Sequence, residues 1–265
     1  MQRPRPAESR QREFARIIAP LDGNDLQRLG HLMIDHIDHS GRRGPHIDPE
    51  ITQVDLAGLA LELAAWGTAD PSELPFLDAP PAKAFAEGRK LLTLLGALDG
   101  EGRLTPVGAE MAALPLHPRL ARMVVDAGDD RALACVVAAL VDDRDVLRGH
   151  PDEVPVDLAV RIRLVVDSSS RHPQAMGRSI QRVRRNAAAL AARIGESGGR
   201  VDADHAGRVL ALAFPDRLAV RRGSPGRFQL RTGTTAWLTA SDPLAVERFL
   251  IPADLDGKRK DARIR

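Results

Sequence analysis

The stretch from Arg103 to Val124, RLTPVGAEMAALPLHPRLARMV, has a helical apolar pattern that prolines interrupt. Proline is tolerated in the first turn of a helix, but further inside it removes a backbone hydrogen bond and clashes with the preceding turn. Pro106 therefore predicts the start of one short helix, Pro115 its end and Pro118 the start of the next. The chain should turn a sharp corner here. The residues expected to pack at this corner are Met111, Leu114, Leu116 and Leu120.

Composition favours helices with aliphatic cores, because 43% of the 265 residues are hydrophobic but only 3% are aromatic, with no tyrosine. The single cysteine, Cys135, excludes an intrachain disulfide, and its apolar setting predicts a buried, inert thiol. These features fit a reducing cytoplasm. No signal peptide and no apolar run of about eighteen residues is present, so we expect a chain that is neither secreted nor embedded in a membrane.

The segment before the corner reads as two helices and a hairpin. The apolar run from Ile51 ends at Gly67, and a second helix, with Pro81 in its first turn, ends at Gly96. Asp-Gly and Glu-Gly pairs in ALDGEGRLT then supply a hairpin turn. Two helices followed by a hairpin predict a winged helix.

Beyond the corner, helical patterns cover 130–142, 156–170 and 176–195. From Phe214 the texture changes to short strand-like runs separated by Gly and Pro. The expected fold class is therefore mostly α: a winged helix and a helical bundle, followed by a small β unit.

The blocks FLDAPP, LLTLLGALDGEGRLTPVG, MAALPLHPRLARMV, LALAFPDRLAVRRG and ADLDGKRKDARIR occur in this order over about residues 49–265. This succession resembles the carboxyl-terminal half of bacterial DEAH-type ATP-dependent helicases of the HrpB kind. The resemblance implies a winged helix at 49–105, a helical ratchet bundle at 106–198 and an OB-like β unit at 199–265, which we expect to be truncated. Residues 1–48 carry one amphipathic helical pattern and stay unassigned.

In that helicase family a pair of RecA-like motor domains precedes the winged helix. This chain has no G-x-x-x-x-G-K-[ST] phosphate loop and no Asp-Glu-x-His box. We therefore read it as a helicase fragment or a motor-less relative that is inactive alone and has no catalytic residues. It should need no cofactor; ATP and Mg²⁺ would enter only with a separately supplied motor domain.

The densest polar cluster, HLMIDHIDH, offers possible metal ligands on a predicted helix. A solvated helix face is the favoured reading, because no matching downstream ligands follow, so no metal site is predicted. The residues concerned are His31, Asp35, His36, Asp38 and His39.

A basic row is predicted on the helix 176–195. Its apolar stripe consists of Ile180, Val183, Ala187, Leu190 and Ile194. The roughly opposite face carries Arg178, Arg182 and Arg185 at i, i+4 and i+7. Guanidinium groups at such spacing can follow successive phosphates of a single strand. The alternative is that they solvate the helix or pair with the acidic segment 129–157.

A second basic run lies on the expected β unit: Arg217, Arg221, Arg222, Arg227 and Arg231. OB-like sheets bind single strands through a charged groove and aromatic platforms. Phe228 and Trp237 are the aromatic residues available there, with burial in the core as their alternative role.

These two surfaces predict an accessory module that guides single-stranded RNA or DNA and has no membrane partner. The rival hypothesis is a protein-interaction module whose arginines dock acidic partners. The candidate nucleic-acid-binding residues are Arg178, Arg182, Arg185, Arg221, Arg222 and Arg227.

Overall fold

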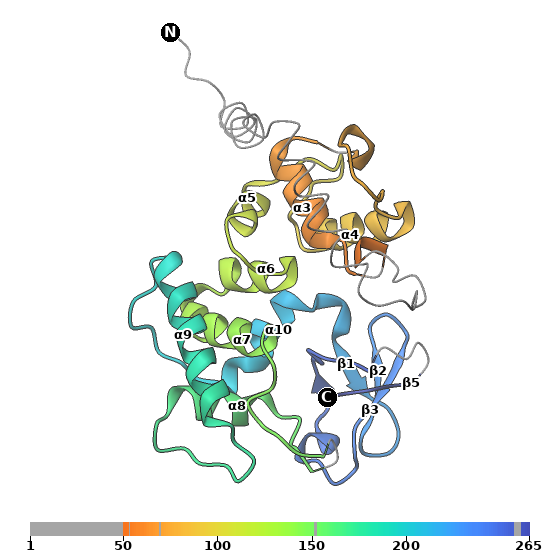
Figure 1. Cartoon of the computed structure of the whole chain (residues 1–265). Helices are drawn as coiled ribbons and strands as arrows, with labels where there is room; N and C mark the ends of the chain where they lie inside the picture. The colour runs from red at the N-terminus through yellow and green to blue at the C-terminus, as the bar shows by residue number, and fades with distance from the viewer. Residues whose placement is uncertain (1–49, 53, 69, 151–152, 257–260) are drawn as a thin grey trace, which may run out of the picture.

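The computed structural model describes residues 50–265 apart from 53, 69, 151–152 and 257–260. Helices form an upper unit and a lower bundle, and a five-stranded sheet lies beside the bundle near the carboxyl terminus (Figure 1). The predicted fold class is confirmed. None of the helices in these residues combines the length and the apolar character that crossing a bilayer demands.

The upper unit begins with the short 3-10 turn η1 (Glu50–Thr52), followed by α3 (Ala57–Trp66), η2 (Pro71–Glu73) and α4 (Ala82–Leu94). Gly67 ends α3 at φ 87°, a left-handed conformation that glycine adopts without strain. Gly88 lets α3 and α4 approach closely, since a Cβ at this position would lie 2.9 Å from the backbone nitrogen of Ala57. Leu98 and Leu104 then bridge as the two sides of the predicted hairpin.

The proline-marked corner is confirmed: α5 (Pro106–Ala112) ends before Pro115, and α6 (Pro118–Asp126) begins after it. Thr105 Oγ1 accepts a hydrogen bond from the backbone of Gly108, which caps α5. The expected corner residues lie inward: Met111, Leu114 and Leu120 are buried, and Leu116 is half-buried against them.

The lower bundle is organised around α7 (Arg131–Val141), which follows η3 (Gly128–Asp130). Helices α6, α8 (Leu158–Val166), α9 (Gly177–Arg193) and α10 (Ala206–Ala213) all pack against α7, and η4 (Ala203–His205) leads into α10. Nearly every side chain of α7 is buried for this reason. Cys135 lies inside it as predicted, and burial raises the pKa of its thiol to about 11.

One apolar core joins the upper unit to the bundle, running without a break from Leu56 to Phe214. Helix α10 contributes Val209, Leu210 and Ala213 to this core. The sequence-based division at 198/199 places α10 in the β unit, whereas its side chains pack with the helices. The physical reason is its amphipathic pattern, whose apolar side faces α6 and α7.

The β unit starts with η5 (Pro215–Arg217) and contains β1 (Ala219–Arg221), β2 (Arg227–Leu230), β3 (Thr235–Trp237), η6 (Pro243–Val246), β4 (Phe249–Leu250) and β5 (Asp261–Arg263). The strand order is β4-β1-β2-β3-β5, antiparallel except for the parallel pair β3–β5. Its separate core centres on Phe228, with side chains of η6 and of Leu255 packed against it. All five strands lie after Phe214, where the sequence predicted short strand-like runs.

Candidate nucleic-acid interface

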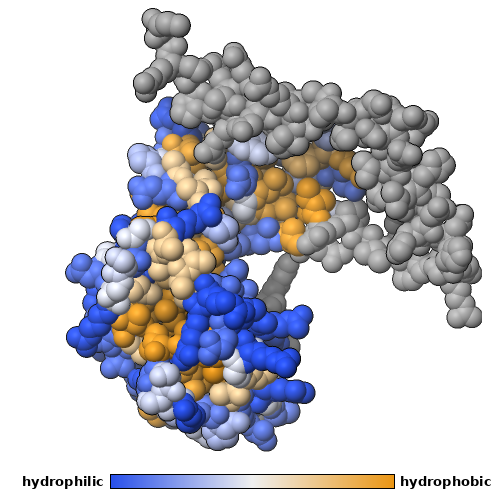
Figure 2. Space-filling view, turned by 60° about the vertical axis from the view of Figure 1, so that its left-hand side comes forward, coloured by the Kyte–Doolittle hydropathy of each residue, from blue (hydrophilic) through white to orange (hydrophobic). Residues whose placement is uncertain are grey.

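Helix α9 presents its predicted apolar stripe to the core. Ile180, Val183, Ala187 and Leu190 are buried, and Ile194 is half-buried just past the end of the helix. Arg178 and Arg185 are exposed on the other side, and no ion pair or hydrogen bond of their side chains is found among the described residues. The side of the molecule where α9 lies shows hydrophilic areas interrupted by apolar ones (Figure 2). Two of the three predicted arginines are thus exposed, and their binding of a ligand stays a prediction.

Arg182 instead forms a bidentate pair with Asp143, just after α7. Its Nε lies 2.5 Å and its Nη2 2.7 Å from the two carboxylate oxygens. The hydrogen bonds from Arg182 hold the pKa of Asp143 below its usual value, and Asp143 raises the pKa of Arg182. The structure thus joins Arg182 to the acidic segment 129–157, which the sequence offered as the alternative to phosphate binding. Arg182 ties α9 to the end of α7.

Arg184, which the sequence prediction left out, closes the end of a neighbouring helix. Its Nε donates to the carbonyl of Val165 and its Nη2 to that of Leu164, both in the last turn of α8. Such carbonyls have no partner within their own helix, so a guanidinium there satisfies them and complements the helix dipole. Within the sequence RVRR, Arg182 and Arg184 therefore make structural contacts, whereas Arg185 is exposed.

The strand register assigns the predicted arginines of the β unit to opposite faces of the sheet. Arg221 pairs with buried Phe228 and so points to the core side, where it is half-buried. Arg222 and Arg227 lie on the other face, since Arg222 Nε reaches Gln229 at 3.2 Å and Arg227 is paired with Trp237. We call this side the outer face; its residues are Val220, Arg222, Arg227, Gln229, Thr235, Trp237, Phe249, Asp261 and Arg263.

The two predicted aromatic platforms have different positions. Phe228 is 1% exposed and forms the centre of the β core, so the prediction that offers it for stacking is wrong and its alternative role is confirmed. Trp237 is half-buried on the outer face with the Arg263 guanidinium 5.3 Å from its ring centroid. Phe249, which the sequence reading overlooked, is 52% exposed on edge strand β4. Strand alternation between Phe249 and Leu250 could have predicted that one of the two points outward. It could not have shown that Phe249 shares a face with Trp237.

Arg217 is a structural residue at the joint between bundle and sheet. It lies over the ring of Phe214 at 4.6 Å and donates to the carbonyl of Ala253. Burial and the neighbouring charge of Arg119 lower its pKa. Arg217 therefore does not belong with the exposed cations of the second basic run.

Arg119, one residue into α6, completes the same joint through a bidentate pair with Asp216, at 2.6 and 2.9 Å. Burial opposes ionisation of Asp216, but the hydrogen bonds and charge of Arg119 outweigh it and hold the pKa of Asp216 below 3.8. On the other side, His117 Nε2 lies 3.6 Å from Asp55, just before α3. The proline corner thus connects winged helix, bundle and sheet.

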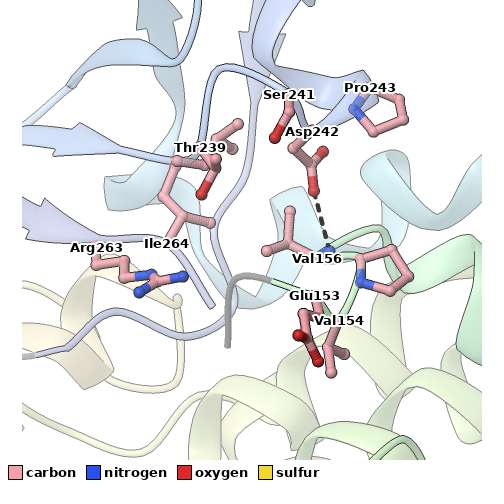
Figure 3. Close-up of a pocket in the computed structure, with 11 residues that line it drawn as sticks. Glu153, Val154, Val156, Thr239, Ser241, Asp242, Pro243, Arg263 and Ile264 are labelled. Carbon is pink, nitrogen blue, oxygen red and sulfur yellow. Dashed lines mark hydrogen bonds between the residues drawn. The ribbon is translucent and has the colours of Figure 1, made fainter. Parts of the chain in front are cut away.

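The described residues line several hollows. A cavity of about 170 Å³ separates the loop at Val156 from the β unit, and Asp242 bridges it by accepting a hydrogen bond from the Val156 backbone (Figure 3). A groove of about 450 Å³ runs between α4 and the Arg119–Asp216 pair. A hollow of about 390 Å³ opens on the outer face, lined by Arg222, Arg227, Gln229, Thr235 and Asp261, with Phe228 beneath.

Within the described residues, no three His, Cys, Asp or Glu side chains gather as a metal site. The histidine and aspartate cluster at 31–39 lies outside those residues.

The comparisons with known proteins agree with this architecture. Residues 89–116 match the winged-helix helicase associated domain (HA2). The ATP-dependent RNA helicase HrpB of Escherichia coli K12 is 39% identical over 84% of this chain and 26% of its own length. The chain resembles the C-terminal, helicase-associated region of HrpB. The resemblance predicted from the ordered blocks is confirmed.

Solved structures show the same relation. A crystal structure of the E. coli DExH-box NTPase HrpB superposes with a TM-score of 0.68 at 38% identity, covering 84% of this chain and 26% of that one. The ATP-dependent RNA helicase HrpA of E. coli K12 is 36% identical over 42% of this chain and 9% of its own length. The chain thus spans about a quarter of the length of HrpB and less of HrpA.

Proposed function

We propose that this chain acts as the accessory region of an ATP-dependent helicase and guides single-stranded nucleic acid past the bundle. The observation that carries the proposal is the pair Arg178 and Arg185, both exposed on a helix whose opposite side is anchored in the core. They lie seven residues apart, about 10 Å along the helix axis. Two exposed guanidinium groups at this separation suit phosphates of one strand, independent of base sequence.

The resemblance to the ATP-dependent RNA helicase HrpB supports RNA as the first ligand to test. A salt titration of the full chain with an unstructured, fluorescently labelled RNA and a DNA of equal length is the direct experiment. Log affinity should fall linearly with log salt, because each phosphate contact releases counterions. Affinity that does not change with salt would contradict the proposal.

We also propose that ATP hydrolysis, with its Mg²⁺, requires a motor domain supplied separately, since the chain carries no phosphate-cradling loop. The purified chain should show no ATPase activity with or without RNA. Nucleic-acid-stimulated turnover by this polypeptide would overturn the accessory role.

A second candidate function is the docking of acidic protein surfaces, because exposed guanidinium groups bind carboxylates as well as phosphates. Arg178 and Arg185 are exposed for this role, whereas Arg182 and Arg227 already pair with Asp143 and Asp261 of the chain itself. Competition between labelled RNA and an acidic peptide of equal charge separates the two functions, because a phosphate-tracking surface should favour the RNA.

A further inference from the structure

Two rows of side chains cross the outer face of the sheet. Through the strand register, the first row consists of Phe249, Val220, Gln229, Thr235 and Asp261, one residue from each strand. The second row consists of Arg222, Arg227, Trp237 and Arg263. Phe249 therefore lies toward one edge of the outer face. Trp237 lies toward the other edge, in the row that contains three arginines.

A guanidinium group already lies next to each of the two aromatic rings, Phe249 and Trp237. The Arg248 guanidinium lies 5.0 Å from the centroid of Phe249, and that of Arg263 lies 5.3 Å from the centroid of Trp237. Phe249 still exposes half of its surface to solvent. An exposed ring next to a guanidinium is the combination that stacks a nucleobase and neutralises its phosphate.

Among the described residues, the opposite side of the sheet packs into the β core, whereas the outer face is open. Phe228, Leu230 and Ala236 are buried beneath side chains of η6 and of Leu255. The outer face instead holds the hollow of about 390 Å³ between Arg222, Gln229 and Asp261. Among the described residues that define this face, Asp261 is the acidic one, and both of its oxygens lie within 3.1 Å of Arg227 Nη1.

We propose that the outer face is a base-stacking surface for single-stranded nucleic acid, with bases on Phe249 and Trp237 and a phosphate at Arg222, next to the Arg227–Asp261 pair. This inference rests on the proposed function and adds a second contact surface, remote from α9. Three strand spacings, about 14 Å, separate the strands of Phe249 and Trp237. That is about four times the rise between stacked bases, so the two rings hold bases of different nucleotides.

The test compares an oligothymidylate with an abasic strand of the same phosphate number, each binding the full chain at low salt. Phe249→Ala should weaken binding of the base-bearing strand on the order of tenfold, the effect of losing one stacked base, and change abasic binding less than about twofold. Phe249→Trp should retain the affinity. Val246→Ala, another exposed apolar side chain of the β unit, is the matched control and should change neither.

Trp237 gives a second readout, since Trp66 is the only other tryptophan of the chain. In a Trp66→Phe background, the base-bearing strand should quench Trp237 fluorescence and the abasic strand should not. Equal weakening of both strands by Phe249→Ala, or of neither, overturns the stacking proposal and leaves the α9 proposal standing.

Two other outcomes are informative. If the wild-type chain binds neither strand, both this inference and the proposed function fail. If an acidic peptide of equal charge quenches Trp237 as the base-bearing strand does, the outer face is a protein-docking surface and the stacking proposal fails.

Discussion

Helix α9 and the β-sheet each carry a basic run, but they differ in what fixes the direction of the arginines. On α9 the 3.6-residue period alone separates buried Val183 and Ala187 from exposed Arg178 and Arg185. On the sheet, alternation separates Arg221 from Arg222, but only the pairing partner Phe228 shows which of them faces the core. A helical face is a local property, whereas a sheet face depends on neighbouring strands.

The helices and the sheet also differ in their hydrophobic cores. The helices share one large core, while the sheet has a small core of its own around Phe228. Damage to each core should therefore unfold different parts of the molecule, and the following substitutions test this separation.

The largest effect is expected from Val183→Asp in α9, since Val183 is fully buried in the larger core. A carboxylate without a partner there should cost about 5 kcal/mol or more, comparable with the whole stability of a domain. Thermal unfolding followed by far-ultraviolet circular dichroism should show loss of helix. Ala188→Asp, at an exposed position of the same helix, is the control and should unfold near the wild-type temperature.

Phe228→Ala should cost about 3–5 kcal/mol, but only in the β unit. Trp237 fluorescence should then report early unfolding of the sheet while the helical signal persists. Phe249→Ala removes the same side chain from an exposed position of the sheet and should have little effect on stability. If Phe228→Ala melts helices and sheet in a single transition, the two cores are one cooperative unit.

Arg119→Gln should cost about 1–3 kcal/mol, because Asp216 loses its partner in a partly buried joint. The pKa of Asp216 is lowered in the folded chain, so the stability from this pair is present above about pH 4 and is lost as pH falls through the lowered pKa. Denaturant titrations between pH 7 and pH 2 should show a smaller acid-dependent loss in Arg119→Gln. Arg122→Gln, which breaks the pair with exposed Asp126, should keep the wild-type pH dependence.

The smallest expected change concerns salt dependence rather than stability. Replacing Arg178 and Arg185 by Gln should lower the slope of log affinity against log salt by about 1.4, or about 0.7 for each phosphate contact with a single strand. Arg182→Gln should leave the slope nearly unchanged, because Asp143 already holds that guanidinium. A loss of slope in Arg182→Gln as large as in the double variant would show that the Asp143 pair opens for the ligand.

The sequence by itself determined the local features of the chain: the corner at Pro115 and Pro118, the end of α3 at Gly67 and the buried stripe of α9. It also carried the ordered blocks that resemble HrpB. These features follow from backbone restrictions and from helical periodicity, which act over a few residues.

Only the tertiary structure decided which cations are occupied and which are available. Arg182 meets Asp143 across 39 residues, and Arg119 meets Asp216 across 97, so no local pattern could pair them. In the same way, strand order and register place Phe249 and Trp237 on one face and Phe228 on the other. Long-range packing sets these relations, because a side chain's partner depends on where the chain returns rather than on its own sequence neighbours.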